Sequence, residues 1–171
     1  MGRRVKNPFQ AVNVVRAVSS AKRDSAGLGI ACHCLVDRGG ECELSTTRLR
    51  VVQWATGNIG LRALREVIRH LALELAGVLV YDPEKDGVDA GTLCGEDPVG
   101  VLASTERAAV RALGADCVLY MPRSLDLEEV VALLESRANI VTTRGELFGA
   151  GHRLGHDGRA QVLAACKRGG S

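Results

Sequence analysis

A glycine-containing turn in this 171-residue chain has the residue types and the spacing needed to bind phosphate groups. Gly57 and Gly60 stand three residues apart, between an apolar run and the start of a helical pattern. A glycine placed like Gly57 lets a phosphate approach the backbone, and one placed like Gly60 lets the helix pack close to the strand. The free N–H groups of the helix N-terminus would then face the phosphates. The turn predicts a dinucleotide-binding site formed by Ala55, Thr56, Gly57, Asn58, Ile59 and Gly60.

A carboxylate follows at the distance expected of such a site. Asp82 comes 22 residues after Gly60, at the end of the next apolar run. An acid there accepts hydrogen bonds from the hydroxyls of the adenosine ribose and disfavours a 2′-phosphate. The pattern therefore predicts NAD or NADP as the cofactor, with NAD slightly favoured, although Lys85 could partly reverse that preference. Ala55 replaces the first glycine of the usual G-x-G-x-x-G pattern, so a glycine turn that binds another ligand is the alternative.

The elements that must position these residues alternate between strands and helices. Apolar, β-branched runs predict strands, and apolar residues at helical spacing predict helices after them. The expected strands are residues 49–55, 75–81, 116–121 and 140–143, and the expected helices start at 61, at 104 or 105, at 127 and at 157. Asp126 followed by Glu129 resembles a capping box. Strands alternating with helices form right-handed βαβ units, so the predicted fold is a doubly wound α/β fold with a parallel sheet.

Residues 1–48 differ from the rest of the chain. They hold eight Lys and Arg residues against four Asp and Glu, whereas residues 49–171 carry a small excess of acidic groups. No periodic core pattern precedes Leu49, although residues 8–21 could form a short amphipathic helix. We therefore expect a poorly ordered, irregular basic extension at 1–48 and one domain at 49–171. A targeting segment and a start codon assigned too far upstream are the alternatives for the extension.

Composition argues against several classes of partner. Aromatic residues make up only 3% of the chain, so base-stacking surfaces are scarce and no nucleic-acid partner is expected. No apolar run approaches the roughly 20 residues of a membrane span, and no membrane partner is expected. Without a visible signal peptide, the six cysteines indicate a reduced, cytoplasmic protein. No metal site is expected, because two groups lack a complete ligand set: Cys32, Cys34 and Cys42, and His152 with His156.

Three segments together resemble the dihydrodipicolinate reductase family. They are residues 51–95, which begin VVQWATGNIG, residues 115–122 (ADCVLYMP) and residues 139–148 (NIVTTRGELF). Within that family they are most similar to the branch of NAD(P)H-dependent amine dehydrogenases that includes 2,4-diaminopentanoate dehydrogenase. The resemblance covers about residues 49–171. It implies a Rossmann cofactor domain, a separate catalytic and oligomerising domain, and hydride transfer from NAD(P)H to a C=N or C=C bond of an amino-acid-like substrate.

The resemblance also implies which residues hold the cofactor. Residues 54–60 match the pyrophosphate loop, and Asp82 matches the acid that holds the adenosine ribose. Thr142 and Thr143 stand where the reductases have a Gly-Thr-Thr-Gly stretch beside the nicotinamide, a pattern that this chain keeps in part. Pro122 lies in the loop after a predicted strand, so it is expected near the cofactor at the carboxyl edge of the sheet.

The catalytic domain that the family resemblance implies has no counterpart in this sequence. In the family, another strand and then a domain with catalytic His and Lys groups follow the last helix, whereas this sequence stops at Ser171. We therefore expect a truncated Rossmann-type sheet without its last strand or strands, no catalytic residue, and no activity of the chain alone. An amino-acid-like substrate would bind only if a catalytic domain were supplied, and a homo-oligomer stays open. A non-catalytic dinucleotide-binding module and a degenerate, poorly folding product are the alternatives.

Overall fold

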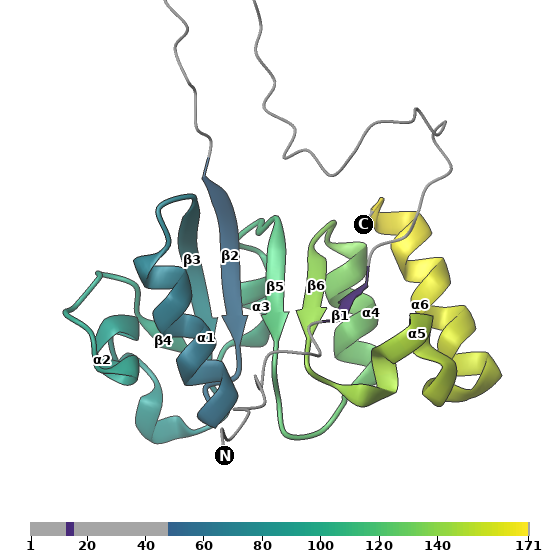
Figure 1. Ribbon diagram of the computed structural model, residues 1–171, viewed down its shortest axis with the longest axis horizontal. Coiled ribbons are helices and arrows are strands. Elements are labelled where there is room, and N and C mark those ends of the chain that lie inside the picture. Colours follow the sequence, from purple (N-terminus) through teal and green to yellow (C-terminus); the bar gives the residue numbers. More distant parts are fainter. Residues whose placement is uncertain (1–12, 16–47, 171) are drawn as a thin grey trace, which may run out of the picture.

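The computed structural model describes residues 13–15 and 48–170, which contain a six-stranded sheet of order β1-β6-β5-β2-β3-β4 (Figure 1). Five neighbouring strands are parallel: β2 (Leu49–Trp54), β3 (Leu73–Leu79), β4 (Ala103–Ser104), β5 (Cys117–Tyr120) and β6 (Asn139–Thr142). Counted along the chain from β2, they follow the 3-2-1-4-5 order of the doubly wound dinucleotide-binding fold. The predicted Rossmann-type fold class is confirmed.

Helices cover both faces of this sheet. The helices are α1 (Asn58–Arg69), α2 (Ala90–Cys94), α3 (Arg107–Arg111), α4 (Leu127–Glu135), α5 (Phe148–Gly151) and α6 (Gly155–Gly169), with short 3₁₀ helices η1 (Pro83–Lys85), η2 (Gly145–Leu147) and η3 (His152–Leu154) between them. Val78 of β3 and Val80, which follows the strand, pack with Leu64 of α1 in one buried cluster. Leu79 belongs to a second cluster with Val130 of α4. Because successive strand residues point to opposite faces, β3 contributes to two cores.

Local side-chain contacts mark the end of α1 and the start of α4. In α1, Leu64 and Val67 are buried while Arg69 is exposed, and the helix ends at His70, whose Nδ1 accepts a hydrogen bond from the Ala72 N–H at 3.1 Å. At the start of α4, Asp126 Oδ1 accepts from the Glu129 N–H at 3.1 Å. The predicted capping box is only half formed, because the Glu129 side chain binds elsewhere.

The N-terminal extension needs a correction at one place. Residues 13–15 form β1 (Asn13–Val15), a short strand that pairs antiparallel with β6. β1 stands inside the stretch 8–21, for which a helix was a candidate, and it takes the edge position next to the fifth parallel strand. The exposed edge of β6 offers unpaired backbone groups, which favour an extended partner. The other residues of the predicted extension, apart from Arg48, lie outside the described residues.

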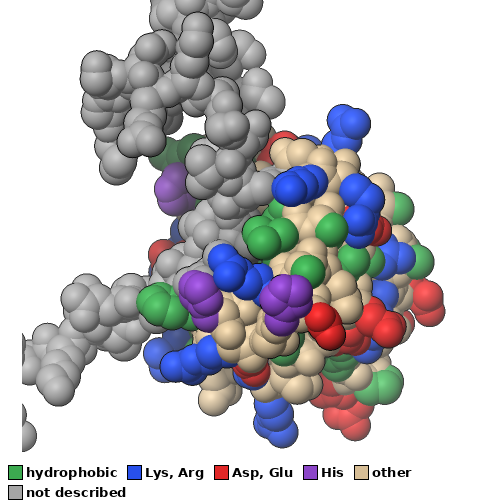
Figure 2. Space-filling view, turned by 90° about the vertical axis from the view of Figure 1, so that its right-hand side faces the viewer, with side chains coloured by type: hydrophobic (Ala, Val, Ile, Leu, Met, Phe, Trp, Pro, Cys, Tyr) green, Lys and Arg blue, Asp and Glu red, His purple; other side chains and the backbone are tan. Residues whose placement is uncertain are grey.

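Two short elements and the start of one helix also differ from the expectation. The sequence analysis did not predict α2 and β4, because elements of five and two residues are too short to show a period. The helix expected from residue 104 or 105 starts at Arg107, since Ser104 ends β4. His152 and His156, expected to be loop or surface residues, lie in η3 and in the first turn of α6. Both histidines are exposed, and Figure 2 shows histidine side chains on the side of the molecule that carries α5 and α6.

Candidate functional site

The carboxyl ends of four neighbouring strands carry the residues predicted from the sequence. Thr142, Tyr120, Trp54 and Leu79 stand in register across β6, β5, β2 and β3. The segments that follow these strands hold Ala55, Thr56, Gly57, Asn58, Ile59, Gly60, Asp82, Pro122 and Thr143, with Thr142 itself at the end of β6. The strand order changes direction between β2 and β5, and open α/β sheets bind ligands outside the carboxyl ends at such a point.

The turn after β2 has a left-handed alanine packed against a glycine. Ala55 adopts a φ of 77°, a conformation that costs an L-residue with a Cβ roughly 1–2 kcal/mol. A Cβ added to Gly60 would lie 2.1 Å from the Ala55 carbonyl oxygen, so α1 can approach β2 this closely only with glycine. The same carbonyl accepts a hydrogen bond of 2.8 Å from Nε2 of the buried Gln53. The sequence analysis did not single out Gln53, although it is the one polar residue in the run VVQW.

The first turn of α1 is open to an anion. Gly57 is the N-cap residue with a φ of −73°, and it has no side chain to cap the helix. A Cβ added there would meet no atom within 4 Å. Asn58 and Ile59 are exposed, whereas Thr56 is buried. The N–H groups at this helix end therefore have space in front of them for a phosphate, and the residues present fit a dinucleotide.

A carboxylate and an ammonium group flank this turn. Asp82 is exposed, and its Oδ1 accepts a hydrogen bond of 3.1 Å from the Glu84 N–H, which fixes the start of η1. Lys85 Nζ lies 3.5 Å from the Thr56 carbonyl oxygen, so the ammonium group stands beside the turn 55–60. The edge of the sheet next to β3 thus offers an acceptor for ribose hydroxyls and a cation for a phosphate.

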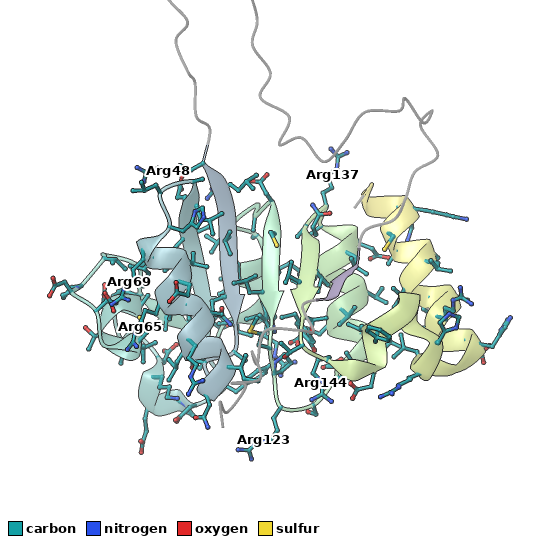
Figure 3. The ribbon with its side chains drawn as sticks, in the orientation of Figure 1. Arg48, Arg65, Arg69, Arg123, Arg137 and Arg144 are labelled. Atoms are coloured by element: carbon teal, nitrogen blue, oxygen red, sulfur yellow. The ribbon has the colours of Figure 1, made fainter. Side chains whose placement is uncertain are left out.

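The residues after β5 and β6 divide into buried and exposed ones. Thr142 is fully buried, and its Oγ1 accepts from the Arg144 N–H at 3.0 Å, so this hydroxyl shapes the turn. Thr143 is exposed and Pro122 is buried. Arg144 donates to the Arg123 carbonyl oxygen at 2.7 Å, and both arginines lie at this edge of the sheet in Figure 3. The backbone loops after β5 and β6 are therefore held together by one side chain.

Glu146 pairs with Arg144 in the same region. The Nη2 atom of Arg144 donates a short hydrogen bond to Oε1 of Glu146. This bond lowers the pKa of the Glu146 carboxyl below its ordinary value. The edge after β6 consequently carries an ion pair in which the arginine is already engaged by two acceptors.

A second group of side chains, here called the Glu129 cluster, joins the same strand ends to the helices behind them. It consists of Trp54, Tyr81, Arg107 and Glu129. The Trp54 indole N–H donates to the Tyr81 hydroxyl at 3.1 Å, which donates to Glu129 Oε2 at 2.9 Å. Arg107 Nε lies 3.4 Å from Glu129 Oε1, and its guanidinium carbon lies 5.2 Å from the centre of the Tyr81 ring.

Tyr81 is 45% exposed, and its partial burial raises the pKa of its hydroxyl to about 12, with the hydrogen bond to Glu129 acting in the same direction. The sequence analysis missed the cluster, because Trp54 and Glu129 stand 27 and 48 positions from Tyr81 along the chain. Its members come from the ends of β2 and β3 and from α3 and α4. It therefore ties the segments that carry the turn 55–60 and Asp82 to the helices on one face.

The described residues form neither a metal-binding group nor a membrane-spanning helix. Among residues 13–15 and 48–170, no group of three or more His, Cys, Asp or Glu side chains is arranged to hold a metal ion. Cys32, Cys34 and Cys42 lie outside the described residues. No helix in the described part of the chain is long and apolar enough to cross a membrane.

Two of the known proteins that this chain is similar to are amine dehydrogenases. No family model matches the chain. A curated amine dehydrogenase of Streptomyces virginiae is 42% identical over 73 residues, which are 42% of this chain and 20% of that protein. The solved structure of the amine dehydrogenase from Mycobacterium smegmatis superposes with a TM-score of 0.57 at 21% identity, over 68% of this chain and 37% of that one. The chain spans about a fifth of the length of the curated relative, and the structural likeness shows the fold.

Proposed function

We propose that the chain binds NAD(H) or NADP(H) and serves as the cofactor-binding domain of an amine-dehydrogenase-like oxidoreductase. The turn 55–60 carries this proposal, because it stands where the strand order reverses, with Gly60 packed under the Ala55 carbonyl and Gly57 open. The likeness to two proteins named amine dehydrogenase supports the class of enzyme. A bound nicotinamide cofactor supplies the hydride in such chemistry.

Each predicted residue has a role in this proposal. The N–H groups of the turn 55–60 and of the first turn of α1 hold the pyrophosphate, and Asp82 accepts from the adenosine ribose. Pro122, Thr142 and Thr143 border the nicotinamide, with the exposed Thr143 as the residue free to touch it. NAD is slightly favoured because of Asp82, and Lys85 leaves NADP as the second candidate.

A substitution at Gly57 tests the proposal directly. Trp54 is the one tryptophan of the chain and immediately precedes the turn, so its fluorescence can follow a titration with NADH. Gly57→Val would place a branched side chain in front of the helix N-terminus, and we expect at least a roughly tenfold loss of affinity. The fold should persist, because nothing lies within 4 Å of the added Cβ. Ala108→Val, in the exposed first turn of α3, is the matched control.

The proposal fails if the folded, unsubstituted chain shows no saturable binding of NADH or NADPH. It also fails if Gly57→Val binds as tightly as the unsubstituted chain. Circular dichroism of each variant separates lost binding from lost structure.

The finer chemistry comes from the resemblance to the dihydrodipicolinate reductase family. We propose hydride transfer to a C=N or C=C bond of an amino-acid-like substrate, with the chain inactive alone. Hydride transfer needs a positioned substrate and a proton donor, which we expect a separate catalytic domain to supply. The test is oxidation of NADH by the chain with a cyclic imine of an amino acid. Turnover by the chain alone would show that no other domain is needed.

Four further expectations complete the proposal. The division into an extension at 1–48 and a cofactor domain at 49–171 is the first, and a cytoplasmic location is the second. The third is that the oligomeric state stays open, with a homo-oligomer as one candidate that analytical ultracentrifugation would test. The fourth is that neither nucleic acid nor a membrane is a partner.

A further inference from the structure

Gln53 is a fully buried polar side chain beneath the phosphate-binding turn. It lies on β2, two residues before Ala55, and has no exposed surface. Its Nε2 donates to the Ala55 carbonyl oxygen at 2.8 Å and lies 3.4 Å from the Leu119 carbonyl oxygen of β5. A Cβ added to Gly60 would lie 3.1 Å from the same nitrogen. The amide thus sits where β2, β5 and the first turn of α1 meet.

Only the nitrogen of this amide has a hydrogen-bond partner among the described residues. Its Oε1 is buried and has no hydrogen-bond donor among the described residues. A buried acceptor without a donor is unfavourable, so an apolar side chain of similar size would suit the sheet better. The opposite amide orientation would place Oε1 against the Ala55 carbonyl oxygen, where two acceptors repel. We therefore look for the function of this side chain in the hydrogen bond that Nε2 donates to the Ala55 carbonyl oxygen.

The group held by Nε2 belongs to a residue in an unfavourable backbone conformation. Ala55 has a φ of 77°, which glycine adopts freely and alanine does not. We propose that Gln53 compensates for the missing first glycine of the turn, because its hydrogen bond holds the Ala55 carbonyl in the left-handed geometry. That geometry brings the carbonyl over Gly60 and leaves the N–H groups of α1 open. Gln53 is a positioning residue that acts through Ala55, and its effect on a ligand rests on the proposed function.

A double-mutant cycle tests this compensation. The four proteins are the unsubstituted chain, Gln53→Met, Ala55→Gly and the double variant, each measured for NADH affinity and thermal unfolding. Gln53→Met should weaken NADH binding about tenfold in the unsubstituted background. In the Ala55→Gly background the same change should weaken it less than about threefold, because glycine holds the turn without help. Gln161→Met, at an exposed position of α6, should change neither quantity.

Equal losses in the two backgrounds would overturn the proposal, because a merely structural role of Gln53 does not depend on residue 55. If Gln53→Met alone does not fold, the double variant must fold, and its failure to do so also overturns the proposal. If the unsubstituted chain binds no NADH, the proposed function fails. The thermal unfolding data then still test whether Gln53 compensates for alanine at position 55. Gln53→Met should then lower the unfolding midpoint more with alanine than with glycine at position 55, and additive effects contradict the inference.

Discussion

At the scale of single residues, the buried carboxylate of Glu129 organises the strand ends beside the candidate site. Its side chain is only 5% exposed and receives the Tyr81 hydroxyl and the Arg107 guanidinium. Glu129→Leu leaves these donors without their acceptor, so we expect the free energy of unfolding to fall by about 1–3 kcal/mol. Denaturation with urea measures this change. Glu128→Leu, at the exposed neighbouring position, is the control, and an equal loss in both variants would contradict the role of Glu129.

Tyr81 makes the stability of the fold depend on pH in the alkaline range. The pKa of its hydroxyl is raised from the ordinary value of 10.0 to about 12, mainly through partial burial, so the folded state favours the neutral hydroxyl. This contribution is complete below pH 10 and is lost as the pH rises from about 10 to about 12. Tyr81→Phe should therefore lose less stability than the unsubstituted chain as the pH rises from about 10 to about 12, as measured by urea denaturation. Identical pH dependence in both proteins would refute the assignment.

We propose that Lys85 influences the choice between NAD and NADP. Its ammonium group lies 3.5 Å from the Thr56 carbonyl oxygen, beside the turn 55–60. If a 2′-phosphate binds there, Lys85→Met should weaken NADPH binding about tenfold and NADH binding less than threefold. Titrations followed by Trp54 fluorescence give both affinities. Lys167→Met, on the exposed surface of α6, is the control, and an unchanged ratio of the two affinities would exclude Lys85 as the discriminating group.

At the scale of elements, α4 and α6 pack side by side through a glycine. A Cβ added to Gly169 would lie 1.9 Å from the Leu134 carbonyl oxygen, and backbone atoms cannot move aside cheaply. Gly169→Ala should lower the free energy of unfolding by about 1–3 kcal/mol. Lys167→Ala, exposed in the same helical turn, should change it by less than about 0.5 kcal/mol. Thermal unfolding of both variants measures the difference, and similar midpoints would argue against a close helix contact.

The elements also show which parts of the fold the sequence can predict. The four longer parallel strands and α1 and α4 follow from local apolar patterns, and so does the turn 55–60 with Asp82 after the next strand. β4 and α2 are too short for a period, and β1 exists through its pairing with β6. The Glu129 cluster and the Gln53 contact with Leu119 join residues far apart in the chain, which no local pattern encodes.

At the scale of the whole molecule, the five parallel strands should form a folding unit without the extension. Deletion of residues 1–47 removes β1, yet it leaves both buried clusters intact. We expect an unchanged circular dichroism spectrum and an NADH affinity within about threefold of that of the full chain. Self-association should rise, because the edge of β6 is uncovered. Deletion of residues 1–12, which keeps β1, is the control. A shortened chain that is unfolded would show that the extension belongs to the domain.

The direction of β1 has a practical consequence for labelling this protein. Because β1 runs antiparallel to β6, Asn13 lies next to Thr142, at the edge where the candidate cofactor residues gather. An affinity tag or a fluorophore fused ahead of Asn13 is thus tethered beside that edge, at a high effective concentration. The end of α6, by contrast, packs against the last residues of α4, close to where β6 begins. Fusions at the carboxyl terminus are therefore the better choice for binding measurements.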